Sequence, residues 1–282
     1  MCFLRSLFLF LVLSIYPFFF KRNLCFSKNS FVNETFSTAD RIPVALIKSN
    51  KFRIKRIILD PGHGGRDPGA QGSHFKEKDI TLAIGILLKE RLLKKYPELK
   101  IILTRDRDKF IDLDERASLA NKKKADLFIS IHCNANGNSA AKGPEVYAIG
   151  VNSSPENLKI AERENSVILL EPNYEKKYEG FNPNYPESYI IFSLLQDYTI
   201  NQSLRLASKI EKSIHIHKED SRGIKQAGFL VLRRNTVPSI LLETGFITNK
   251  KEENELGSRE GQVRLVNDIL NGYEKYRKSV ED

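Results

Sequence analysis

Cysteine is scarce in this chain of 282 residues. Two of the three cysteines, Cys2 and Cys25, lie in or beside an apolar N-terminal segment, so Cys133 stands alone in the rest of the sequence. A lone cysteine excludes a disulfide within that part. The fold is therefore expected to depend on its packed core and on any metal that it binds.

The N-terminal apolar run, Leu7–Phe20, is too short for a typical membrane-spanning helix. It follows Arg5 and fits the hydrophobic region of a secretory signal, so residues 1–27 are predicted to be a signal peptide cut near residues 25–27. Lys21 and Arg22 directly behind the run leave a short uncleaved anchor as the alternative. The polar residues 28–54 are predicted to form a linker.

The sequence shows no internal repeat, low-complexity tract or nucleic-acid-binding motif. Its formal net charge is +10, but the lysines are spread along helical patterns instead of forming one basic arm. In an exported protein this charge favours contact with cell wall or lipid head groups over nucleic acid. The length and the apolar content are typical of a packed domain and exclude a disordered chain, and we expect a monomer.

Short apolar runs alternate with amphipathic helical patterns over residues 55–278. This alternation predicts a single α/β domain whose mostly parallel, twisted sheet has helices on both faces. The expected strands are Arg56–Leu59, Ile101–Thr104, Leu127–Ile131, Gly143–Ile149 (near a sheet edge because of Pro144), Phe229–Leu232 and Ser239–Leu242. The expected helices are Lys78–Lys95, Leu113–Lys124, Pro155–Leu169, Glu187–His215 and Gly261–Lys278. Residues 151–202 break the regular alternation and are predicted to be an insertion.

Three of these strands are followed by side chains of the types that bind metals in proteins. A glycine-rich turn after the first strand holds His63, the strand Leu127–Ile131 runs into His132, and Ser239–Leu242 runs into Glu243. Glu77 follows the glycine-rich turn at the start of a helix. Because ligands bind at the carboxyl ends of parallel strands, two imidazoles and one carboxylate there suggest a catalytic zinc set, and a second glutamate remains to act as a base.

Each of these residues also has a purely structural interpretation. His63 could be a turn histidine bonded to backbone, and His132 a half-buried imidazole at a strand end. Glu77 alone fits a first-turn acid favoured by the helix dipole. Glu243 differs because a carboxylate at the mouth of a buried strand is costly unless it has a function or an arginine partner.

Taken together, the motifs resemble the zinc-dependent N-acetylmuramoyl-L-alanine amidases that separate bacterial cells. The resemblance extends over residues 55–278 and rests on Leu59–Gly65, Asp67–Ala70, Glu77–Asp79, Leu103–Arg105, Ser130–His132 and Leu242–Asn249. It implies a peptidoglycan substrate, with cleavage of the amide between N-acetylmuramic acid and L-alanine. It also implies that His63, Glu77 and His132 bind Zn²⁺ and that Glu243 is the catalytic residue.

Neighbouring residues leave alternatives open. Cys133 stands where the family usually has a small residue, and strand alternation predicts a packed thiol instead of a fourth ligand. Arg105 is expected to have a structural role, with binding of substrate carboxylates as the alternative. Asn134 is a candidate for orienting a ligand or the substrate. His74, His215 and His217 are expected in polar or charged surroundings away from the site.

The insertion, residues 151–202, resembles the regulatory segment of the division-associated members of this family. That resemblance implies a helix that covers the zinc cleft until an activator protein displaces it, with Glu164 and Glu187 as candidates for the acid that caps the metal. A substrate-binding subdomain is the alternative. For the whole chain, the alternatives are a zinc peptidase that cuts stem peptides and a wall-binding module without catalysis.

Overall fold

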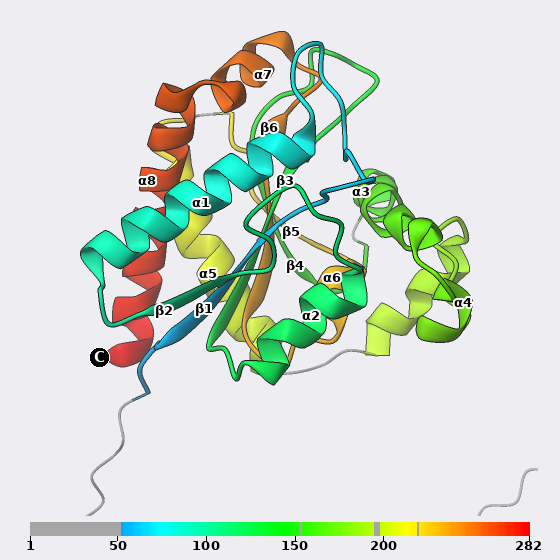
Figure 1. Ribbon diagram of the computed structural model, residues 1–282, viewed down its shortest axis with the longest axis horizontal. Coiled ribbons are helices and arrows are strands. Elements are labelled where there is room, and N and C mark those ends of the chain that lie inside the picture. Colours follow the sequence, from blue (N-terminus) through cyan, green and yellow to red (C-terminus); the bar gives the residue numbers. More distant parts are fainter. Residues whose placement is uncertain (1–51, 153, 195–197, 219) are drawn as a thin grey trace, which may run out of the picture. The chain divides into compact units, whose positions relative to one another are not determined.

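The computed structural model describes residues 52–152, 154–194, 198–218 and 220–282 (Figure 1). Its centre is a six-stranded sheet in the order β2-β1-β3-β6-β4-β5. The strands are β1 (Arg56–Pro61), β2 (Lys100–Leu103), β3 (Leu127–Asn134), β4 (Glu145–Ile149), β5 (Ile224–Ala227) and β6 (Ser239–Phe246). Neighbours from β2 to β6 are parallel, whereas β4 runs antiparallel to β6 and parallel to β5. The predicted fold class, a mostly parallel α/β sheet, is confirmed.

Helices cover both faces of the sheet (Figure 1). Helices α1 (Glu77–Lys95), α5 (Tyr198–His215) and α8 (Arg259–Glu281) share one face and its apolar core, and α7 (Lys250–Gly257) packs on α8. Helices α2 (Leu113–Lys122) and α6 (Leu230–Arg233) lie on the other face. The central strands β1, β3 and β6 are mostly apolar because both of their faces are buried, and their polar side chains include those of the site at the carboxyl ends. Ile54, just before β1, also packs into the core.

The register of the parallel strands brings three chain segments to one edge of the sheet. Pro61 is aligned with Ile131, and His132 with Glu243. The carboxyl ends of β1, β3 and β6 therefore meet, and each strand delivers its next side chains to the same place.

Residues 154–194 form a helical layer beside the α2 and α6 face (Figure 1). It consists of α3 (Pro155–Asn165), the 3₁₀ helix η2 (Ser166–Leu170), the short helix α4 (Tyr174–Lys177) and the 3₁₀ helix η3 (Pro186–Leu194). Its apolar side chains, Ile160, Ile168 and Phe181 among them, join the same hydrophobic cluster as Tyr147 of β4. Among the described residues, we found no helix whose length and apolar character would let it cross a membrane.

One predicted strand assignment is wrong and one is confirmed. Strand β4 lies near an edge of the sheet, as expected, with β5 as the edge strand beyond it, and Pro144 removes no hydrogen bond from the ladder because it precedes the first paired residue. The run from Phe229 to Leu232 ends in helix α6, and the strand is β5, just before it. A short apolar run is buried in either form, so periodicity could not separate the two.

Candidate metal centre and active site

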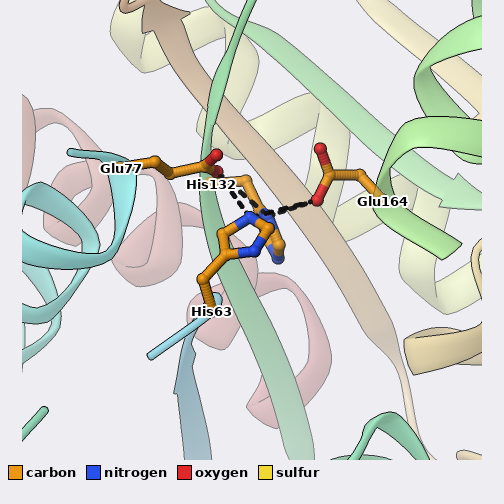
Figure 2. A group of neighbouring side chains, drawn as sticks. All are labelled: His63, Glu77, His132 and Glu164. Atoms are coloured by element: carbon orange, nitrogen blue, oxygen red, sulfur yellow. Dashed lines mark ion pairs between the residues drawn. The ribbon is translucent and has the colours of Figure 1, made fainter. Parts of the chain in front are cut away.

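Four side chains from four separate elements converge at the carboxyl edge of the sheet (Figure 2). His63 lies in the loop after β1, Glu77 begins α1, His132 is in β3 and Glu164 is near the end of α3. One potential ligand atom from each lies within 4.8 Å of the other three. The Glu77 Oε1 atom is 3.1 Å from His63 Nε2 and 3.2 Å from His132 Nδ1, and Glu164 Oε2 is 3.3 Å and 2.9 Å from the same nitrogens.

The glycine-rich loop lets the two imidazoles approach each other. His63 has a φ of 59°, in the left-handed region. A Cβ atom on Gly62 would lie 2.5 Å from His132 Cε1, and one on Gly69 would lie 2.6 Å from Glu77 Oε2. Larger residues at these two positions would push the ligands apart, so the glycines that marked this loop in the sequence have a steric function here.

Two of the three predicted ligands, His63 and Glu77, are oriented by further hydrogen bonds. His63 Nδ1 lies 2.7 Å from Asp67 Oδ2, so its Nε2 faces the centre of the group. Glu77 accepts hydrogen bonds from the backbone nitrogens of Ala70 at 2.7 Å and Cys133 at 2.8 Å. Such outer contacts fix the direction of metal ligands before the metal binds.

Two buried arginines hold the loop from behind. Arg116 donates to Asp60 at 2.8 Å, to the carbonyl of Pro61 at 2.7 Å and to the carbonyl of His63 at 2.6 Å. Arg105 donates to the carbonyls of Pro61 and Gly62 at 3.0 Å and 2.7 Å. Burial raises the pKa of Asp60, but the Arg116 charge and hydrogen bonds outweigh it and hold that pKa below its ordinary value. The structural interpretation of Arg105 therefore fits its contacts.

The donor set fits a metal cation. His63 Nε2, His132 Nδ1 and Glu164 Oε2 are buried and find no hydrogen-bond partner among the described residues, although they point at one another. Burial lowers the pKa of both imidazoles, yet Glu164 and Glu77 raise that of His132 to about 9, and Glu77 and Asp67 raise that of His63 well above its ordinary value. The carboxylates thus draw positive charge onto both imidazoles, and a divalent ion would supply that charge with both rings neutral.

Glu243 lies beside this group, directly across from His132 in the neighbouring strand. It is fully buried, and its Oε1 atom is 3.2 Å from Arg163 Nη2, while Oε2 has no hydrogen-bond partner among the described residues. Burial raises its pKa to about 8, with Arg163 opposing the rise. A carboxyl group with such a pKa suits general base and acid catalysis near neutral pH.

The structure thus brings His63, Glu77, His132 and Glu243 together, as the sequence analysis expected, while their roles remain predictions. Of the two acids proposed to cap the metal, Glu164 joins the group, whereas Glu187 is exposed on η3. Cys133 is a packed thiol in the core, as predicted, with its Sγ atom 3.3 Å from Thr244 Oγ1.

Two of the histidines that were expected away from the site lie outside it. His74 Nδ1 lies 3.8 Å from Glu253 Oε2, and His217 Nδ1 lies 2.7 Å from Asp268 Oδ1; neither histidine belongs to the four-residue group. Asn134 contacts Arg163, a residue that no sequence motif marked as part of the site. The only sequence signal for Arg163 is its position next to Glu164 in the last turn of α3.

Comparison with known proteins gave concordant matches. The family model described as N-acetylmuramoyl-L-alanine amidase matches residues 57–275. The amidase AmiA of Escherichia coli K12 is 38% identical over 234 residues, which cover 81% of this chain and 78% of AmiA. The solved structure of the amidase AmiC2 of Nostoc punctiforme matches with a TM-score of 0.58 and 28% identity over 79% of this chain and 97% of that one. The CwlD amidase of Clostridioides difficile, solved in complex with the GerS lipoprotein, matches with a TM-score of 0.58 and 25% identity over 80% of this chain and 99% of that one.

Proposed function

This chain belongs to the N-acetylmuramoyl-L-alanine amidase family, and from that premise we propose how its own residues act. It is an amide hydrolase of peptidoglycan that splits the bond between N-acetylmuramic acid and the L-alanine of the stem peptide. His63, Glu77 and His132 hold a Zn²⁺ ion, and Glu243 is the catalytic acid and base. The observation that supports these roles is the convergence of the four side chains at one edge of the sheet.

When bound, Zn²⁺ supplies a Lewis acid that polarises a carbonyl and lowers the pKa of water to about 7. The protein supplies the rest. Glu243 takes a proton from the attacking water and delivers it to the leaving nitrogen, for which its pKa of about 8 is well placed. The buried arginines keep the His63 loop rigid, so the ligands do not have to be reordered during the reaction.

The structure corresponds to a closed state in this proposal. Glu164 directs a carboxylate oxygen at both imidazoles, and the neighbouring Arg163 covers Glu243. A substrate carbonyl would need the same space. Residues 151–202 therefore act as a regulatory insertion that an activator protein displaces, and the solved complex of the CwlD amidase with GerS supports a protein partner for this fold.

The remaining assignments follow from the sequence. Residues 1–27 export the chain or anchor it, residues 28–54 link this leader to the catalytic domain, and the enzyme acts in the periplasm on the cell wall during separation of daughter cells. The leader and all but the last three linker residues lie outside the described residues.

The proposal is tested by product analysis. Purified cell wall digested with the zinc-loaded enzyme should release intact stem peptides with a free L-alanine amino group, together with sugar chains without peptide. Shortened peptides would instead indicate a zinc peptidase, and no release by a protein that still binds wall would indicate a binding module.

A substitution at Glu243 tests the catalytic role separately. Glu243→Gln should lower turnover by about 10²–10⁴-fold while the zinc content stays at one ion per chain. The exposed Glu260→Gln on α8 is the matched control and should behave as wild type. Wild-type turnover in Glu243→Gln would remove Glu243 from the mechanism.

A further inference from the structure

The Arg163 guanidinium fills a small site whose walls are hydrogen-bond acceptors. Its Nη1 atom is 3.1 Å from Asn134 Oδ1 and 3.0 Å from the carbonyl oxygen of Ala135, and its Nη2 atom is 3.2 Å from Glu243 Oε1. The Arg163 side chain itself is 29% exposed. The acceptors thus belong to the sheet framework, and the donor comes from the insertion.

Asn134 is fixed in this orientation without help from Arg163. Its Oδ1 atom accepts from the backbone nitrogen of Ala135 at 2.8 Å, and its Nδ2 atom donates to Glu145 Oε2 at 3.2 Å. Glu145 is fully buried and is held by Lys225 Nζ at 2.9 Å and by Tyr147 and Arg222. The oxygen of Asn134 will therefore still face the site after α3 has moved away.

Without Arg163, the three acceptors would lose this donor together. Buried acceptors that lose their partners cost free energy, so a ligand that enters here must bring N–H groups, and a positive charge would be favoured beside Glu243. A carbonyl or carboxylate group would be repelled. The site is suited to an amine.

The proposed reaction releases such a group at this place. Water adds to the carbonyl carbon, the C–N bond breaks, and Glu243 passes the water's proton to the nitrogen, so the products are an acid and an amine. Glu243 must be within hydrogen-bond reach of the nitrogen that it protonates. We place that nitrogen beside Oε1, where Arg163 Nη2 now lies, which leaves Oε2, buried without a partner among the described residues, to take the proton from water.

We propose that Arg163 occupies, in the closed state, the subsite for the leaving amino group of the stem peptide, and that Asn134 and the Ala135 carbonyl form this subsite together with Glu243. The inference rests on the proposed function and extends it by orienting the substrate. The acyl group lies over the metal ligands, and the peptide runs past the end of β3. After cleavage the α-amino group takes up a second proton near neutral pH, and the ammonium ion is held by the three acceptors.

The test measures binding of the product peptide, without turnover. The ligands are L-alanyl-γ-D-glutamyl-L-lysine and the same peptide acetylated at the alanine α-amino group. Their affinities are measured by titration calorimetry with the full chain carrying Arg163→Ala. The free amine should bind at least about tenfold more tightly than the acetylated peptide. Wild-type protein, with the subsite filled, should bind the free amine about tenfold more weakly than the variant does.

Three comparisons make the result specific. Adding Asn134→Ala should reduce the preference for the free amine to about twofold, whereas Asn136→Ala in the same loop should leave it intact. Methylguanidinium should compete with the free amine in the Arg163→Ala protein. The preference for the free amine should persist in metal-free protein. If the amine were bound only by the zinc ion, the preference would disappear when the metal is removed.

Equal affinity for the two peptides, a preference that survives Asn134→Ala, or a preference confined to the zinc-loaded protein would each overturn the subsite. If Arg163→Ala does not fold, Arg163→Gln serves in its place, with the same expected preference. The proposed amidase activity is judged by the digestion products alone, so a failed subsite and a failed function give different results.

Discussion

The metal centre joins two regions of the molecule that hold their side chains in different ways. His63, Glu77 and His132 stand on the sheet framework, and His63 and Glu77 are held from behind by Asp67 and by backbone nitrogens. Among the described residues, the Glu164 carboxylate is held by its neighbour Arg163 and by the two imidazoles that it faces. The framework thus preforms the site, whereas Glu164 and Arg163 of the insertion take most of their contacts from the site itself.

The two regions also differ in how much apolar surface they expose. The strands under the ligands are buried on both faces, whereas the insertion exposes large apolar side chains, with Ile190 at 66% and Tyr185 at 60%. The insertion is not loose, because Asn165 bonds to the carbonyl of Gly228 and the nitrogen of Leu230. A layer anchored on one side and apolar on the other is suited to move when a partner covers its exposed face.

The largest expected effect comes from removing a framework ligand. His132→Ala should abolish turnover and weaken zinc binding by about 10²–10⁴-fold, if one protein ligand of three carries a third of a binding free energy of about 10–16 kcal/mol. Metal analysis of the purified variant beside the wall-digestion assay measures both. His217→Ala, a histidine outside the site, is the control. Retention of zinc with wild-type affinity in His132→Ala would show that the metal is held elsewhere.

The next effect concerns the support of the framework. Arg116→Met leaves Asp60 charged and buried without its partner, so the free energy of unfolding should fall by about 3–5 kcal/mol in urea titrations. Arg234→Met breaks an exposed pair with Asp114 near the same helix and should cost less than about 1 kcal/mol. Adding Asp60→Asn to Arg116→Met should restore part of the loss. Equal losses for the two arginines would mean that the buried pair does not support the loop.

The framework was predictable from the sequence because its signals are local. Apolar runs before His132, interrupted only by Ser130, and before Glu243 indicate strands buried on both faces, and in parallel strands the residues that follow must share one edge. The glycines around His63 indicated a close approach, which the contacts of Gly62 confirm. The side chains that hold these residues, Arg116 above all, are distant in sequence and gave no signal beyond a charge in a helix.

The insertion was predictable only in part, and for a physical reason. Its 3₁₀ segments have no strong periodicity, and the expected single helix over residues 187–215 is replaced by η3 and α5, which have separate bounds. Glu164 could be named as a candidate, but an acid on a helix looks the same whether it faces solvent or a metal. Arg163 becomes informative only when Glu243 is seen beside it.

A smaller effect is expected from the insertion side of the centre. Glu164→Ala removes charged contacts of about 1.5–3 kcal/mol that favour the closed state, so basal wall digestion should rise by about tenfold to a hundredfold while zinc remains bound. Glu162→Ala, two residues earlier on the same helix, is the matched control and should keep the low basal rate. A loss of activity in Glu164→Ala would favour the alternative in which the insertion helps to bind substrate.

The smallest effect is a pH dependence of zinc affinity and of metal-free stability, which tests the contact of the insertion with the framework without altering a framework residue. In metal-free protein the pKa of His132 is raised to about 9, against the effect of burial, by Glu164 and Glu77, so this ring carries a proton at pH 7 that zinc must displace. Apparent zinc affinity should therefore rise by about tenfold per pH unit for each displaced proton, up to about pH 9. The metal-free fold should show the opposite trend. The proton on His132 stabilises it fully below the unfolded pKa of about 6.5, and this contribution is lost as the pH rises towards 9.

Calorimetry of zinc binding in buffers of different ionisation enthalpy counts the protons that are released. Melting curves of metal-free protein at several pH values measure the loss of stability as the pH rises. In Glu164→Ala the pKa of His132 should fall, so zinc affinity should level off at a lower pH than in wild type, while Glu162→Ala should keep the wild-type profile. If the two profiles coincide, Glu164 does not act on the imidazoles in solution, and the insertion does not close over the metal centre as it does in the structure.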